Sequence, residues 1–175
     1  LTVTPLGVDG AFVATDPGRR GELPPGVTPP YLLHVGDLHE RRNLTMLIGA
    51  VLSARRQSKA AQSLSLVLVG TDLGVGDAVS AIAARAGAAD AVVRLGSVNE
   101  RRLRALYQGS VALAYPSFYE GFGLPLVEAM ACGTPVIASN VASMPEVLGD
   151  AGILIDPRDE GAWTQAIVGL MNGGE

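Results

Sequence analysis

Short apolar runs alternate with stretches of helical periodicity along most of this chain, and no other feature constrains its fold as strongly. Six apolar runs are predicted as strands: 31–36, 64–70, 91–96, 111–115, 134–139 and 152–156. The stretches that follow them predict helices at 43–57, roughly 75–86, 99–108, about 124–132, 143–148 and 159–171. Apolar strands separated by helices are typical of a parallel sheet covered on both faces. The sequence therefore predicts an α/β fold, a Rossmann-like doubly wound parallel six-stranded sheet, with ligands beyond the carboxyl ends of the strands.

The N-terminal part of the chain differs from the rest. It holds Pro5, Pro17, Pro24, Pro25, Pro29 and Pro30, more than half of the 11 prolines, and it shows no helical period. We predict that residues 1–30 are a hinge or linker from a missing N-terminal domain and that residues 31–175 form the folded domain. Because the chain starts at Leu1 without a charged leader or cleavage site, we expect a piece of a longer protein, not a secreted precursor.

Composition and charge argue against several classes of protein. The 175 residues are 48% hydrophobic and 17% charged, which excludes a disordered tail. The net charge of −4 and the pI of 5.2 argue against a nucleic-acid or anionic-membrane binder. No apolar run reaches the roughly 18 residues of a transmembrane segment. The single cysteine, Cys132, cannot form an internal disulfide, which fits a reducing compartment, and we expect it to be packed and inert.

The loop after the first predicted strand carries two adjacent cations. Its one glycine, Gly36, makes neither the G-x-G-x-x-G pattern of dinucleotide-binding folds nor a Walker A sequence. Arg41 and Arg42 stand just before a predicted helix whose N-cap is Asn43, although cations are disfavoured at this end of a helix. Two explanations stay open: a bound anion shared by Arg42 and the helix amides, or two guanidiniums that point into water.

The glycine-rich segment that follows the fourth predicted strand along the chain predicts an anion-binding site. Gly121 and Gly123 let the backbone approach a ligand closely, and Pro125 suits the first turn of a helix that ends at Gly133. The amides of residues 122–126 would then point beyond the edge of the sheet, where a helix start attracts negative charge.

Two carboxylates flank this predicted anion site. Glu120 lies in the loop, and Glu128 lies about one turn inside the helix. They would repel an anion unless each binds hydroxyl groups instead, so a sugar or a ribose diol is their natural partner. The alternative is that both are ordinary solvated residues.

The segment EGFGLPLVEAMACGTPVIAS (120–139) resembles the E-x7-E signature of retaining GT-B glycosyltransferases, specifically glycosyltransferase family 4. Other parts of the chain resemble this family in the same order. PLGVD…F (5–12) is similar to the hinge before the C-terminal domain, and VGDLHERRNL (35–44) to the first phosphate-binding loop. LGSVNERRLRALY (95–107) is similar to the base-side loop, and MPEVLGDAGILIDPRD (144–159) to the following helix and strand.

The resemblance implies roles for individual residues. Glu120 would be the catalytic residue, which contacts the donor sugar hydroxyls and helps hold the anomeric centre. The implied donor-binding residues are Gly36, Arg42, Val98, Gly121, Phe122, Gly123, Leu124 and Glu128. Among these, Arg42 would pair with the diphosphate, Glu128 would accept both ribose hydroxyls, and the backbone of Val98 would bind the base. Asp37 departs from the family pattern, because many members carry a second diphosphate-binding arginine there and an acid cannot do that work.

The resemblance also implies the function of the whole protein. It implies the C-terminal donor-binding half of a GT-B fold, in a retaining hexosyltransferase of polysaccharide biosynthesis. GDP-mannose is slightly favoured as donor because residues 139–146 resemble mannosyltransferases, and a UDP-sugar comes next. A glycan or lipid-linked acceptor would bind the missing N-terminal domain, so this chain alone would be inactive. The family is expected to need no metal or other cofactor and to be cytoplasmic, or peripheral at the inner membrane surface.

Two other classes stay open, a non-catalytic nucleotide-binding module of the same fold and a GT-B-type epimerase or phosphorylase.

Three further residues have simpler interpretations. His34 lies within a strand and is predicted as a core histidine. His39 lies in the site loop without a visible partner, and the two histidines lack a metal-ligand spacing with Cys132. Trp163 is predicted to anchor the last helix to the sheet.

Overall fold

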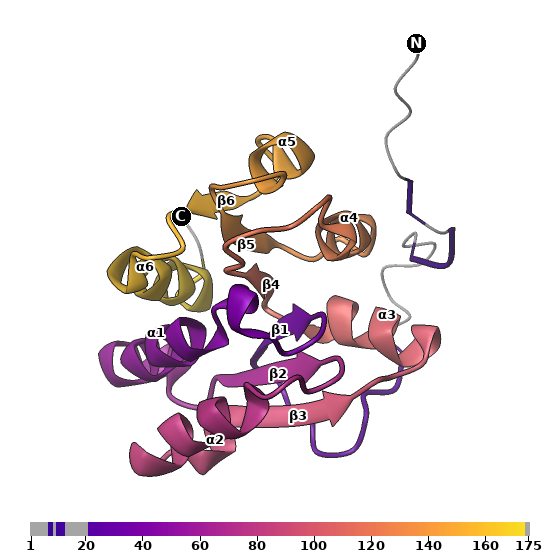
Figure 1. Cartoon of the computed structure of the whole chain (residues 1–175). Helices are drawn as coiled ribbons and strands as arrows, with labels where there is room; N and C mark the ends of the chain where they lie inside the picture. Colours follow the sequence, from indigo (N-terminus) through magenta and orange to yellow (C-terminus); the bar gives the residue numbers. More distant parts are fainter. Residues whose placement is uncertain (1–6, 9, 13–20, 174–175) are drawn as a thin grey trace.

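A computed structural model describes residues 7, 8, 10–12 and 21–173 of the chain, and its centre is one parallel sheet (Figure 1). The six strands are β1 (Tyr31–Val35), β2 (Ser65–Val69), β3 (Val92–Gly96), β4 (Ala112–Tyr115), β5 (Val136–Ser139) and β6 (Ile153–Ile155). They lie in the order β3-β2-β1-β4-β5-β6, and all neighbours pair in parallel. The chain begins in the middle of the sheet and winds outward in both directions, which confirms the predicted doubly wound fold.

Helices cover both faces of the sheet (Figure 1). They are α1 (Leu44–Gln57), α2 (Gly76–Arg85), α3 (Glu100–Gly109), α4 (Leu124–Ala131), α5 (Met144–Leu148) and α6 (Glu160–Met171). Short 3-10 helices lie at η1 (Gly10–Phe12), η2 (Glu40–Arg42), η3 (Lys59–Ala61) and η4 (Ala89–Ala91). Side chains of α1, α2 and α6 share one hydrophobic cluster, and those of α3, α4 and α5 share the other.

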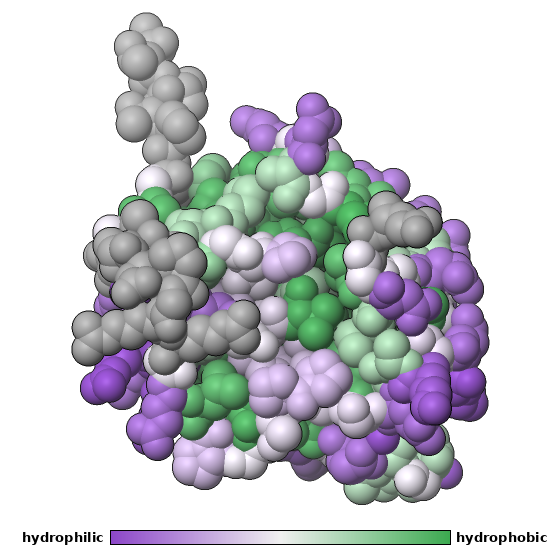
Figure 2. All heavy atoms as spheres, turned by 180° about the vertical axis from the view of Figure 1, so that it is seen from behind, coloured by the Kyte–Doolittle hydropathy of each residue, from purple (hydrophilic) through white to green (hydrophobic). Residues whose placement is uncertain are grey.

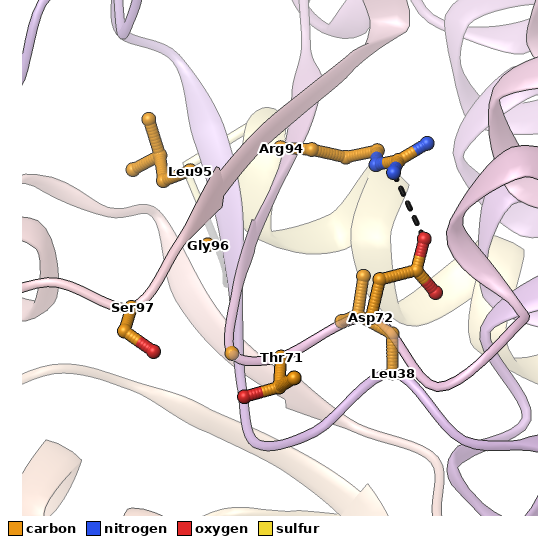
Figure 3. A pocket seen from close by; sticks show the side chains of 8 residues that line it. Leu38, Thr71, Asp72, Arg94, Leu95, Gly96 and Ser97 are labelled. Carbon is orange, nitrogen blue, oxygen red and sulfur yellow. Dashed lines mark hydrogen bonds and ion pairs between the residues drawn. The ribbon is translucent and has the colours of Figure 1, made fainter.

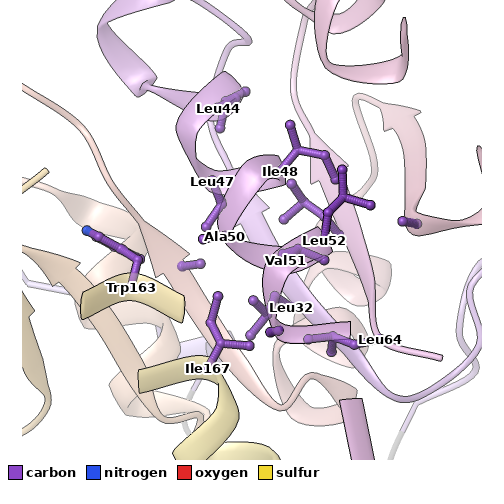
Figure 4. Packing of buried hydrophobic residues seen from close by; sticks show 14 of the residues in the cluster. Leu32, Leu44, Leu47, Ile48, Ala50, Val51, Leu52, Leu64, Trp163 and Ile167 are labelled. Atoms are coloured by element: carbon purple, nitrogen blue, oxygen red, sulfur yellow. The ribbon is translucent and has the colours of Figure 1, made fainter. Parts of the chain in front are cut away.

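The cluster under α1 and α6 includes the one tryptophan. Leu47 and Val51 of α1 and Trp163 and Ile167 of α6 are fully buried and point toward the sheet (Figure 4). The indole Nε1 of Trp163 donates a hydrogen bond to the carbonyl of Asp156, 3.1 Å away. A fully buried indole therefore keeps its polar atom satisfied, and the prediction that Trp163 anchors the last helix is confirmed.

The described part of the N-terminal segment packs against the domain. Phe12 of η1 is buried, and its ring meets the edge of Tyr107 at 6.1 Å between centroids. The thiol of Cys132 donates to the carbonyl oxygen of Phe12 at 3.3 Å, and burial raises the pKa of this thiol to about 11. Cys132 is thus packed and held as a thiol, as predicted. Most of residues 1–20 lie outside the described residues, so the hinge and the boundary at 30 remain predictions.

The start of α1 differs in detail from the prediction. Asn43 occupies the N-cap position, but its φ is +56° and its side chain makes no capping hydrogen bond. Its Nδ2 donates instead to the carbonyl of Pro157, 2.6 Å away, which ties the start of α1 to the loop before α6.

The surface of the molecule mixes polar and apolar residues. Seen from behind, strongly polar residues gather toward the rim, and apolar residues interleave with weakly polar ones across the middle (Figure 2). In the part of the chain that the structure describes, none of the helices is both long and apolar enough to cross a membrane.

Candidate functional site

The loops that follow β1 and β4 meet beyond the carboxyl ends of these two central strands. Nη1 of Arg41 lies 2.9 Å from Oε1 of Glu120, and Nη1 of Arg42 contacts the same oxygen. The backbone amide of Phe118 also donates to the carbonyl of Arg41 at 2.9 Å. The two arginines therefore do not point freely into water. Part of their charge is already neutralised within the protein, without an external anion. They surround a carboxylate that comes from the other loop.

Gly36 makes room for the more buried of these two arginines. Its φ is +134°, a conformation that side-chain-bearing residues rarely adopt. A Cβ atom at this position would lie 2.8 Å from Nη2 and 2.9 Å from Cζ of Arg42. The guanidinium therefore packs directly against the backbone at the end of β1, and only glycine permits this approach.

Tyr115, the last residue of β4, supports the same guanidinium. Its hydroxyl accepts a hydrogen bond from Nη1 of Arg42, and Cζ of Arg42 lies 5.1 Å from the ring centroid. Burial raises the pKa of Tyr115 to about 12, so it stays a neutral hydroxyl beside the cation. Sequence reasoning missed this residue, because a tyrosine that ends an apolar run resembles any core residue.

His34 lies under Tyr115, as part of β1. The two rings stack with centroids 5.6 Å apart and 21° between their planes. His34 is fully buried, and Nδ1 donates to the carbonyl of Ala114 at 3.0 Å. Burial lowers the pKa of His34 to about 3, so the imidazole is neutral. The prediction of a core histidine is confirmed, and its neutral ring adds no charge beneath Arg42.

The start of α4 presents backbone amides with no partner in the protein. Gly123 adopts a left-handed conformation with φ of +95°, and no side chain caps the helix. The amides of residues 121–124 make no hydrogen bond within the described part of the chain. The predicted range of 122–126 was wrong at its end, because Pro125 has no N–H and the amide of Leu126 donates to the carbonyl of Gly123 at 2.9 Å. Four amides remain, at a helix end that attracts anions.

A serine from the next loop holds the backbone of this segment. Oγ of Ser143 donates to the carbonyl of Phe122 at 3.0 Å and to that of Glu120 at 3.2 Å. With these two carbonyls turned toward Ser143, the loop is fixed on one side by β5–α5 and on the other by Arg41. The sequence carried no signal for this serine.

Glu128 lies on α4, where it faces a residue of α3. The hydroxyl of Tyr107 donates to its Oε2 at 2.8 Å, and Oε1 has no partner among the described residues. Burial, together with this carboxylate, raises the pKa of Tyr107 well above its usual value of 10.0. Glu128 is only half-buried. It therefore offers one oriented carboxylate oxygen to a hydroxyl-bearing ligand. Tyr107, like Tyr115 and Ser143, is a residue that the sequence did not reveal.

A cavity of about 570 Å³ opens at the carboxyl ends of β2 and β3 (Figure 3). Leu38, Gly70, Thr71, Asp72, Arg94, Leu95, Gly96 and Ser97 line it. Arg94 bonds Asp72 at 2.8 Å. The other oxygen of Asp72 accepts the backbone N–H groups of Gly74, Val75 and Gly76, and these amides, the Gly76 one foremost, lower the pKa of this carboxyl. The loop that forms one side of the cavity is therefore held in place by the hydrogen bonds and the ion pair of Asp72.

Val98, predicted as a base contact, follows the last residue that lines this cavity. Its side chain is half-buried against the cluster of α3, α4 and α5. Asn99 next to it caps α3 by accepting the amide of Arg102 at 3.0 Å. Among the described residues, no hydrogen bond links Val98, Glu120 and Glu128 to one another. The predicted site residues are therefore spread along one edge of the sheet and do not form a single cluster.

The remaining loop residues have local partners. Asp37 is exposed, and its Oδ1 accepts the amide of Thr71 at 3.2 Å. Nδ1 of His39 accepts the amide of Arg41 at 3.2 Å and so caps η2. Among the described residues, the structure brings together no group of three or more histidine, cysteine or acidic side chains that could hold a metal ion. A metal-independent reaction remains a prediction.

Comparison with known proteins identifies the family of this chain. A family model described as glycosyl transferases group 1 matches residues 29–173, most of the chain. The chain belongs to this family.

Relatives of this group 1 domain include named enzymes. The O-antigen chain mannosyltransferase B of Escherichia coli is 39% identical over 129 residues, which are 74% of this chain and 33% of that protein. The D-inositol 3-phosphate glycosyltransferase of Segniliparus rotundus is 32% identical over 98% of this chain and 39% of that protein. The structure of sucrose-phosphate synthase from Thermosynechococcus elongatus superposes with a TM-score of 0.70 and 30% identity, over 82% of this chain and 36% of that chain. The chain thus spans between a third and two fifths of these relatives.

Proposed function

We propose that this chain is the donor-binding domain of a retaining hexosyltransferase, which binds a nucleoside-diphosphate sugar and stabilises the departing diphosphate. The observation that carries the proposal is the set of unpartnered amides at residues 121–124, beside the buried guanidinium of Arg42 and within the same loop as Glu120. Membership of the group 1 glycosyl transferases supports it.

The proposed chemistry is electrostatic. When the bond between the sugar and the β-phosphate breaks, negative charge grows on the phosphate oxygen. Donors that are already oriented stabilise this charge more than they stabilise the bound donor, and this difference accelerates the reaction. The amides of 121–124 are fixed by the backbone, and Arg42 is fixed by Tyr115 and Gly36, so both meet this requirement without rearrangement.

The two carboxylates take different parts of the donor. Glu120, held between Arg41 and Arg42, would accept hydroxyls of the transferred sugar next to the anomeric carbon. Glu128, with Oε1 open, would accept the ribose hydroxyls through charge-assisted hydrogen bonds. The base would then lie toward Val98 and the cavity of β2 and β3. Under this proposal each of the separate groups contacts one part of a single extended ligand.

The proposed donor is GDP-mannose first and a UDP-sugar second. Similarity to an O-antigen chain mannosyltransferase supports mannose and a role in polysaccharide biosynthesis. The acceptor, a glycan or a lipid-linked glycan, would bind the part of the protein beyond this chain. A free and buried cysteine fits a reducing compartment, so we place the protein in the cytoplasm. Any association with the inner membrane surface would come from the part of the protein beyond this chain.

A binding panel tests the proposal. We expect GDP, GDP-mannose, UDP and UDP-glucose to raise the unfolding temperature of this chain in proportion to occupancy, with the guanine nucleotides strongest, because a ligand that binds only the folded state stabilises it. The nucleosides without phosphate are the matched controls. If no nucleoside diphosphate shifts the transition more than its nucleoside does, the chain is not a donor-binding domain.

A further inference from the structure

Arg41 and Arg42 share one carboxylate, and this leaves a positive charge unbalanced. Both Nη1 atoms contact Oε1 of Glu120. One carboxylate balances one guanidinium, whereas the diphosphate of a nucleotide sugar carries two negative charges. Two guanidiniums therefore match that diphosphate in charge, provided that both can reach it.

The two arginines differ in how firmly they are held. The side chain of Arg42 is 9% exposed, donates to Tyr115 as well as to Glu120, and packs against Gly36. The side chain of Arg41 is 40% exposed and donates only through Nη1, to Glu120 and to the carbonyl of Tyr119 at 3.2 Å. Its Nε and Nη2 have no partner in the described residues. Glu120 is only 9% exposed, but Arg41 is partly solvated and Glu120 would keep Arg42 as a partner. Arg41 is therefore the arginine that can leave Glu120 at the smaller cost.

The neighbouring loop position cannot supply the second cation. Asp37 is an acid, exposed, and tied to the amide of Thr71. A phosphate beside it would be repelled, so a second cationic contact must come from another residue. Arg41 has the free donors of a planar guanidinium fork, which binds two phosphate oxygens at once.

We propose that Arg41 is the second cationic contact of the donor diphosphate, and that Glu120 serves as a stand-in anion that holds Arg41 until the donor binds. The inference rests on the proposed function. On binding, Arg41 moves from Glu120 to a phosphate, while Arg42 keeps its contact with Glu120. The exchange leaves part of the carboxylate open to the sugar hydroxyls. Glu120 therefore balances one of the two guanidiniums in the empty site, and the occupied site gains the contact between Arg41 and the phosphate.

Four single variants and one double variant test the exchange by titration calorimetry with GDP and UDP. Arg41→Gln should weaken binding of the better nucleoside diphosphate about tenfold, the loss expected for a charged hydrogen bond. Binding of the nucleoside should change less than about twofold, because it has no phosphate for Arg41 to contact. Arg41→Lys keeps the charge without the fork and should recover part of the loss. Arg56→Gln removes the same charge from an exposed arginine of α1 whose side chain, among the described residues, hydrogen-bonds to Ser53, and it should bind like wild type.

A variant of Glu120, the partner of Arg41, distinguishes a phosphate-binding role of Arg41 from a merely structural one. Glu120→Gln should bind the nucleoside diphosphate about threefold more tightly than wild type, because Arg41 is released from its ion pair with Glu120. In the Arg41→Gln background the same change should give no gain. Urea unfolding of each variant shows whether it is folded before it is titrated.

Two results would overturn the inference. If Arg41→Gln binds the diphosphate as well as Arg56→Gln does, Arg41 only ties the loop to η2. If Glu120→Gln tightens binding equally with and without Arg41, the stand-in role is wrong. Failure of wild type itself to prefer diphosphates over nucleosides is a different outcome, because it refutes the proposed function and this inference with it.

Discussion

Replacing His34 by a residue that does not titrate should make the free energy of unfolding fall less steeply as the pH is lowered below 6.5. In the folded chain this ring is fully buried with a pKa of about 3, against 6.5 for a free histidine. The unfolded chain therefore binds a proton that the folded chain refuses. Stability that His34 contributes is fully present above pH 6.5 and is lost as the pH falls from there toward 3.

The size of this effect follows from the two pKa values. Each pH unit inside that window costs up to about 1.4 kcal/mol of unfolding free energy. Between pH of about 7.5 and about 4.5, His34 alone should remove about 3 kcal/mol of unfolding free energy. His34→Asn is the suitable variant, since its amide nitrogen can still donate to the carbonyl of Ala114 while nothing titrates at that position.

Urea unfolding of both proteins at four pH values measures the effect. Carboxylates elsewhere also respond to acid, but they are the same in both proteins and cancel in the difference. We expect the stability advantage of wild type over His34→Asn to shrink steadily on acidification. If the two curves of free energy against pH run parallel, His34 is not held neutral by burial, and the account of the layer under Arg42 is wrong.

Two further predictions concern residues that shape the site. Gly36→Ala should destabilise the chain by about 1–3 kcal/mol because φ is positive there, and should also weaken GDP or UDP binding by displacing Arg42. Urea unfolding and calorimetry measure the two losses, and wild-type binding by the variant would show that Arg42 does not depend on this close approach. Tyr107→Phe removes the hydroxyl that orients Glu128 and should cost about 0.5–1.5 kcal/mol of stability. It should also weaken ribonucleotide binding more than deoxyribonucleotide binding, and equal losses for both ligands would contradict the orienting role.

The fold was predictable because its signals are local. Strands buried on both faces appear as apolar runs in the sequence. In β2 every residue after Ser65 is apolar, and the whole strand is buried in the structure. The helices between the strands show apolar residues at helical spacing and end at residues that terminate helices, such as Gly133 after α4. As a result the predicted strands and helices all occur, with boundaries that differ by only one or two residues.

The site was predictable only as a set of residue types in loops. Whether Arg42 met solvent or an anion could not be decided, because its partner Glu120 is 78 positions away along the chain. Tyr107 and Tyr115 contribute hydroxyls to the site, yet each lies among apolar residues and resembles core. Asn43 has the composition of a helix cap, but a distant carbonyl at Pro157 takes its side chain. Contacts between loops depend on the tertiary arrangement, which short-range patterns do not encode.

The central claim is that a ribonucleotide binds with its ribose on Glu128, and Glu128→Gln tests it most directly. The variant keeps the volume of the side chain but loses its charge and turns one acceptor into a donor. Calorimetry should show the ribonucleoside diphosphate bound at least about 1.5 kcal/mol more weakly, since two charge-assisted hydrogen bonds are lost. The 2′-deoxyribonucleotide lacks one of the two hydroxyls and is the control, so wild type should prefer the ribose form and the variant should lose most of that preference. If the preference for ribose survives Glu128→Gln unchanged, Glu128 is a solvated helix residue and the donor site lies elsewhere.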